Sequence, residues 1–70
     1  MTTAVEIFKK VIFNLESPLS TINVIKIQDD VWKTIENGNH LSFKNDSEIV
    51  EMVERLENKG FELKTPYLKY

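Results

Sequence analysis

The stretch SEIVEMVERLENKGF, residues 47–61, carries the clearest structural pattern in the chain. Its apolar side chains recur three and four positions apart, a spacing that places them on one face of a helix. Asn45, Asp46 or Ser47 can cap the start of this helix, and Gly60 can adopt the left-handed conformation that ends one. The sequence therefore predicts a helix here, the last of three that it predicts.

The residues before this helix predict a first helix and a strand. Residues 3–16 place apolar side chains at helical spacing. This helix is expected to end at Ser17, because proline disfavours a helical conformation in the residue before it. Residues 21–27, TINVIKI, are rich in β-branched side chains and predict a strand.

The middle of the chain predicts a second, shorter helix over residues 29–37, DDVWKTIEN. Its aspartates are interpreted as caps of the helix start, and Gly38 as its end. Residues 40–44 alternate apolar and polar side chains and predict a half-buried strand, and residues 61–64 predict another. The resulting order is α-β-α-β-α-β. It predicts one α+β domain over residues 1–70, with a three-stranded sheet packed by helices.

A winged helix is the alternative architecture for the same order. Residues 52–64, MVERLENKGFELK, resemble the third helix and following strand of winged-helix proteins, a match that consists of a helix, a glycine and a strand. The resemblance implies that the second and third helices pack together and that the last strands form the wing. It also implies a transcriptional regulator that binds nucleic acid.

The outward face of the third predicted helix is acidic, which opposes DNA binding by that helix. Glu48, Glu51 and Glu54 lie opposite its apolar arc, with Arg55 as the cation among them. Duplex DNA carries one negative charge per about 1.7 Å of its axis, so these carboxylates would be repelled from the major groove. The acidic face is either solvated or contacts a basic surface on a larger protein, as the acidic surfaces of small viral inhibitors do.

Phe13 breaks the pattern of the first predicted helix. On a regular helix its ring falls in the polar sector, beside Lys9 and Lys10. Three explanations fit: the helix is covered on both sides, it ends or bends before Phe13, or the ring contacts a partner or a second subunit. Aromatic side chains are enriched among interface anchors, and lysine stems can frame one. Phe13, Lys9 and Lys10 are therefore candidate partner contacts.

The aromatic residues near the C-terminus form another candidate surface. Tyr67, Leu68 and Tyr70 either close the core or complete an edge strand, a position where Pro66 is tolerated. An unpaired edge can accept a strand from another chain. Tyr67 and Tyr70 are therefore candidate partner contacts as well.

The sequence contains no pattern that predicts catalysis, a metal site or a cofactor. There is no cysteine, and His40 is the only histidine, so the usual thiolate and histidine sites for metals are not expected. The net charge of −2 does not favour attraction to DNA or to acidic membranes. The longest apolar run, residues 11–13, is too short to cross a bilayer.

These observations predict a small non-catalytic regulator or inhibitor that acts by binding a larger protein. A phage or mobile element is a source that fits such a protein. The expected partner presents a basic surface, and a homodimer is a further way to support a small domain that lacks disulfides and metals. The alternative function is nucleic-acid binding by the winged helix through lysines away from the acidic helix. The lack of cysteine and of a signal-peptide core predicts a cytoplasmic location.

Overall fold

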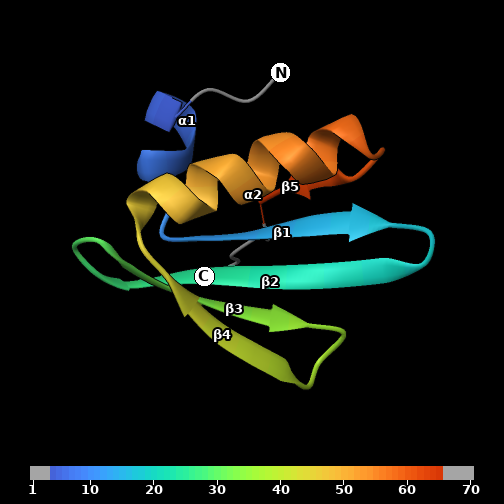
Figure 1. The fold of residues 1–70 in the computed structure, drawn as a ribbon, viewed down its shortest axis with the longest axis horizontal. Helices are drawn as coiled ribbons and strands as arrows, with labels where there is room; N and C mark the ends of the chain where they lie inside the picture. Colours follow the sequence, from blue (N-terminus) through green and yellow to red (C-terminus); the bar gives the residue numbers. More distant parts are fainter. Residues whose placement is uncertain (1–3, 66–70) are drawn as a thin grey trace, which may run out of the picture.

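The computed structural model describes residues 4–65, which form a five-stranded antiparallel sheet and two helices (Figure 1). The strand order is β4-β3-β2-β1-β5. Successive hairpins join β1 to β4, and α2 then carries the chain back so that β5 pairs with β1. The elements are α1 (Ala4–Phe8), β1 (Ile12–Ser17), β2 (Ser20–Gln28), β3 (Val31–Glu36), β4 (His40–Lys44), α2 (Asp46–Asn58) and β5 (Glu62–Lys64).

The predicted α-β-α-β-α-β order and its three-stranded sheet are wrong, and the winged-helix arrangement is absent from residues 4–65. The first predicted helix is split: α1 ends at Phe8, and the chain continues as β1. The second predicted helix is the strand β3. In both strands buried residues alternate with half-buried ones, which is the period of a strand with one covered face. Over segments this short, the apolar spacing fits a helix and a strand about equally well.

The residues interpreted as caps of the second helix form turns instead. Asp30 lies in the turn between β2 and β3 and has a φ of 62°. Asn37 and Gly38 have φ values of 52° and 83°, and the Asn39 amide donates to the Glu36 carbonyl at 3.2 Å. Two successive residues with positive φ are the mark of a type I′ turn, which asparagine followed by glycine favours. These residues therefore reverse the chain between strands.

Four other predicted elements are confirmed, and one of them is the last strand, β5, over Glu62–Lys64. Residues 21–27 lie within β2, and residues 40–44 are β4. Asn45 caps α2: its Oδ1 accepts from the Glu48 amide at 2.9 Å, while Glu48 Oε1 accepts from the Asn45 amide at 3.0 Å. This reciprocal capping box satisfies two amides that a helix start would otherwise leave without partners.

The core lies between one face of the sheet and the two helices. The rings of Phe13 on β1 and Trp32 on β3 meet edge to face, with centroids 6.0 Å apart. Trp32 Nε1 donates to Asp46 Oδ1 at 2.7 Å, which ties β3 to the first turn of α2. The buried apolar residues are Ile7, Phe13, Leu15, Ile22, Val24, Trp32, Ile49, Met52, Val53 and Leu56.

Candidate functional site

The sheet face turned away from α1 and α2 is covered by no helix of the described chain. Residues paired across antiparallel strands share a face, so the register identifies which side chains lie on it. We call this surface the open face. Its centre consists of two rows that cross from β1 to β4, namely Ile12, Ile25, Lys33 and Phe43 in one row and Asn14, Asn23, Ile35 and Leu41 in the other.

The apolar exposure of the open face is greatest on β4. Leu41 is 52% exposed and Phe43 is 59% exposed, whereas Ser42 between them is half-buried on the helix side. In Figure 1, β4 forms the lower edge of the sheet, and α2 lies at the other side of the picture, near β1 and β5. Ile27, at a register shift in β2, adds a side chain that is 50% exposed. Exposed apolar side chains that lie together mark interaction sites more often than scattered ones do.

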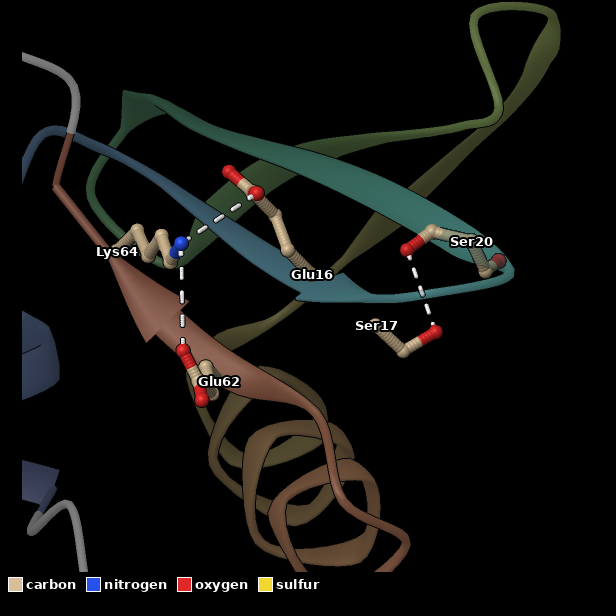
Figure 2. Close-up of polar contacts among 5 residues, drawn as sticks. All are labelled: Glu16, Ser17, Ser20, Glu62 and Lys64. Carbon is tan, nitrogen blue, oxygen red and sulfur yellow. Dashed lines mark hydrogen bonds and ion pairs between the residues drawn. The ribbon is translucent and has the colours of Figure 1, made fainter.

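The charges of the open face are placed unevenly. At the β5 side, Lys64 Nζ lies 3.8 Å from Glu16 Oε1 and 4.0 Å from Glu62 Oε2 (Figure 2). Lys33 lies in the apolar row between Ile25 and Phe43, and it takes part in none of the ion pairs formed by the described residues. The middle of the open face therefore combines five apolar side chains with two asparagines and a single cation, Lys33.

The two edges of the sheet differ in how they are protected from other strands. β5 has only three residues, and Leu63 is flanked by the charged Glu62 and Lys64. β4 has five residues and places Leu41 and Phe43 beside its free edge. Charges and short length discourage edge pairing, and the central part of β4 has neither charge nor proline. Among the described strands, β4 is the edge more open to another chain.

The structure separates Phe13 from the lysines that were predicted to frame it. Phe13 is fully buried in the core, so it is not available to a partner of the folded protein. Of the three explanations for its position, the second holds, because α1 ends before Phe13. Lys9 is exposed in the turn after α1, and Lys10 Nζ donates to Thr65 Oγ1 at 2.8 Å.

The acidic residues predicted to meet a partner lie on the outward side of α2, away from the open face. Glu51 and Glu54 are exposed there. Glu48 is also exposed, but its carboxylate is engaged in the capping box. Tyr67 and Tyr70 lie outside the described residues. The predicted contacts therefore do not form one site.

The open face was not predicted as a site from the sequence. The alternation of Leu41 and Phe43 with polar neighbours predicted a strand with one apolar face, and that pattern is present. It gave no sign that the apolar face would be turned away from the helices. Since strand alternation shows that two faces differ but not which is covered, this signal alone could not have found the site.

No group of three or more histidine, aspartate or glutamate side chains within the described residues could hold a metal ion. One open hollow of about 590 Å³ lies beside the β1–β2 turn, lined in part by Pro18, Leu19 and Phe61. Ser17 Oγ donates to the Ser20 carbonyl at 3.4 Å in this turn (Figure 2), and Leu19 at its tip is 94% exposed. A single apolar side chain at a turn tip is ordinary on protein surfaces.

Comparison with protein-family models, curated proteins and solved structures finds no match to this chain. None of the helices that the structure describes has the length and apolar character needed to cross a bilayer. The open face and the β4 edge are therefore the surfaces of the described chain that offer the best evidence of a function.

Proposed function

We propose that the protein is a small non-catalytic binding module that regulates or inhibits a larger protein by contacting it through the open face. The observation that supports this proposal is the exposure of Leu41 and Phe43 together on a sheet face without a helix. Burying apolar surface is the main driving force of protein association, and it yields about 25 cal/mol for each Å² removed from water. A cytoplasmic location is part of the proposal, supported by the lack of cysteine.

The charge on the open face suggests what the partner surface carries. A partner that covers Lys33 removes its ammonium group from water, and a buried charge without a partner is costly. The fitting partner is an apolar surface with a carboxylate placed to meet Lys33. The acidic side of α2 is weaker evidence for a basic partner surface than the open face is for an apolar one. Glu51 precedes Arg55 by four residues, a spacing that favours attraction between the two side chains on the helix without any partner.

The test compares two charge reversals that alter net charge equally. Lys33→Glu changes the centre of the open face, and Lys9→Glu changes an exposed lysine after α1. Each variant is used with the wild-type protein for affinity capture from nuclease-treated lysate of the source organism. The captured protein is then purified, and its affinity for the three proteins is measured by calorimetry. We expect Lys33→Glu to weaken binding at least tenfold and Lys9→Glu to leave it within twofold.

Circular dichroism must first show that both variants keep the wild-type fold. Equal affinity of the wild-type protein and Lys33→Glu would contradict a contact through the open face. Loss of binding in Lys9→Glu alone would assign the contact to the region of α1. Absence of any protein that binds the purified chain would refute the proposed function.

A further inference from the structure

We infer that two copies of this chain pair through β4, in antiparallel register about a two-fold axis at Ser42, so that their sheets join into one. The inference goes beyond the proposed function, because it concerns the sheet edge and a second copy of the chain. β4 lies at the end of the strand order and has a partner strand on one side only. Such a strand leaves amide and carbonyl groups of its free edge unpaired.

The direction of one carbonyl fixes which residues of β4 face the free edge. Thr34 Oγ1 on β3 lies 3.4 Å from the Ser42 carbonyl oxygen, so the Ser42 carbonyl is directed toward β3. In an antiparallel strand, successive residues direct their backbone groups to opposite sides. The amide and carbonyl groups of Leu41 and Phe43 are therefore directed outward, where a second strand can reach them.

Pairing two copies about a two-fold axis at Ser42 gives hydrogen-bond partners to the outward backbone groups of both Leu41 and Phe43. It places Leu41 opposite Phe43 of the second copy, and the same contact is repeated by symmetry. Each of the two pairs can exchange two backbone hydrogen bonds, as hydrogen-bonded pairs of an antiparallel ladder do. Ser42 then faces its own copy in a pair without backbone hydrogen bonds, where a small side chain fits the close approach of the strands.

The side chains agree with this register. Leu41 and Phe43 lie on the open face, so the two copies bring four exposed apolar side chains together across the new pair. His40 lies opposite Lys44 of the second copy at the ends of the pair, where both side chains can turn to water. The joined open faces form one larger surface on which a partner of the proposed kind can bind.

Two other ways of pairing copies are opposed by charge. Stacking one open face on another would remove Lys33 of both copies from water, and Lys33 has no ion-pair partner among the described residues of its own copy. Pairing through β5 would use three residues, two of them charged and already joined in the Lys64 contacts with Glu62 and Glu16. The β4 edge therefore accommodates a second copy with the least burial of charge.

Sedimentation velocity of the full chain tests the dimer. A pairing over five residues is small for a protein interface, so we expect association that depends on concentration, examined from about 10 μM to about 1 mM. At the upper end the wild-type protein should approach twice the 8.2 kDa mass of one chain. Leu41→Lys should remain monomeric throughout. The matched control is Ile27→Lys, an equally exposed position on β2, which should still dimerise.

A cysteine variant tests the register, since the natural chain has no cysteine. The symmetric Ser42 pair should bring the two Cα atoms to about 4.5 Å, within the range that a disulfide spans. Ser42→Cys should therefore form a covalent dimer under mild oxidation much faster than Ser47→Cys, an exposed position on α2. Similar rates for the two variants would overturn the proposed register.

The dimer and the proposed binding function can fail separately. A wild-type chain that stays monomeric over the whole range overturns the dimer, even if a larger protein binds the open face. Loss of dimerisation in Ile27→Lys as well as Leu41→Lys also overturns it, because the contact would then involve the face instead of the edge. A dimer that binds no other protein supports this inference and refutes the proposed function.

Discussion

Replacing Phe13 by alanine is expected to destabilise the protein strongly, because its ring lies at the centre of a small core. Phe13 is fully buried and packs edge to face against Trp32. Truncating a buried phenylalanine costs about 3–5 kcal/mol. Because the contact with Trp32 is lost as well, we expect the cost to lie in the upper part of that range. A chain of 70 residues has a total free energy of unfolding of about 4–10 kcal/mol. The substitution therefore removes between about a third and all of the stability.

The assay is urea denaturation followed by the fluorescence of Trp32, the only tryptophan of the chain and a fully buried one. For a small domain the stability falls by about 1 kcal/mol per molar urea, so the midpoint should fall by about 3–5 M or the variant should be unfolded without urea. If Phe13→Ala does not fold, the milder substitution Phe13→Leu can be measured instead. We expect it to lower the free energy of unfolding by about 1–2 kcal/mol. Protein concentration is kept low, so that dimerisation does not add to stability.

The matched control is Phe43→Ala, the same change at a position that is 59% exposed. It should cost under about 1 kcal/mol, because most of the ring is already in water. Equal midpoints for the wild-type protein and Phe13→Ala would refute the reasoning, since Phe13 would then lie outside the core. A larger loss for Phe43→Ala than for Phe13→Ala would show that the two faces of the sheet are assigned the wrong way round.

Two further substitutions test the contacts that position the elements. Asp46→Ala removes the acceptor of the buried Trp32 Nε1–H and should cost about 1–3 kcal/mol in urea denaturation, whereas Asp46→Asn, which keeps an oxygen acceptor, should lose clearly less. Equal losses would show that the hydrogen bond contributes nothing. Gly38→Ala should lower stability by about 1 kcal/mol through its φ of 83° alone, since no atom lies within 4 Å of the added Cβ. In thermal unfolding, Gly38→Asn should be more stable than Gly38→Ala. A Gly38→Ala variant as stable as the wild-type protein would contradict the left-handed conformation of Gly38.

How far the sequence predicted the fold depended on the length of each element. α2 has 13 residues, a capping box at its start and a glycine after its end, so three independent signals agreed. α1 and β1 share a 14-residue segment in which the period changes from helical to alternating, and only Phe13 departed visibly from the helical pattern. That departure was the sign of the change in period. It could equally indicate an exposed ring, because position on a helical wheel does not report what covers a face.

The sequence around Gly38 indicates a hairpin turn more strongly than it indicates the end of a helix, which is how Gly38 was interpreted. An aspartate pair before an apolar segment and a glycine after it are compatible with helix caps, but Asn37 followed by Gly38 is also the usual sequence of a tight hairpin turn. The β-branched Val31, Thr34 and Ile35 between these turns favour a strand. Weighing the turn and the β-branched residues together would have predicted β3, and with it a larger sheet.

The candidate site depends on a property that no local pattern contains, namely where α2 crosses the sheet. β4 alternates as regularly as the buried strands, so its sequence alone suggests that Leu41 and Phe43 belong to the core. In the structure the helix lies on the other face of the sheet. Trp32 Nε1–H on β3 donates to Asp46 at the start of α2, and this contact places the helix on the face of Ser42 and Lys44. Leu41 and Phe43 are left on the other face by the strand period. The exposed apolar edge thus follows from a contact between residues 14 positions apart, which becomes visible only when the helix and the sheet are seen together.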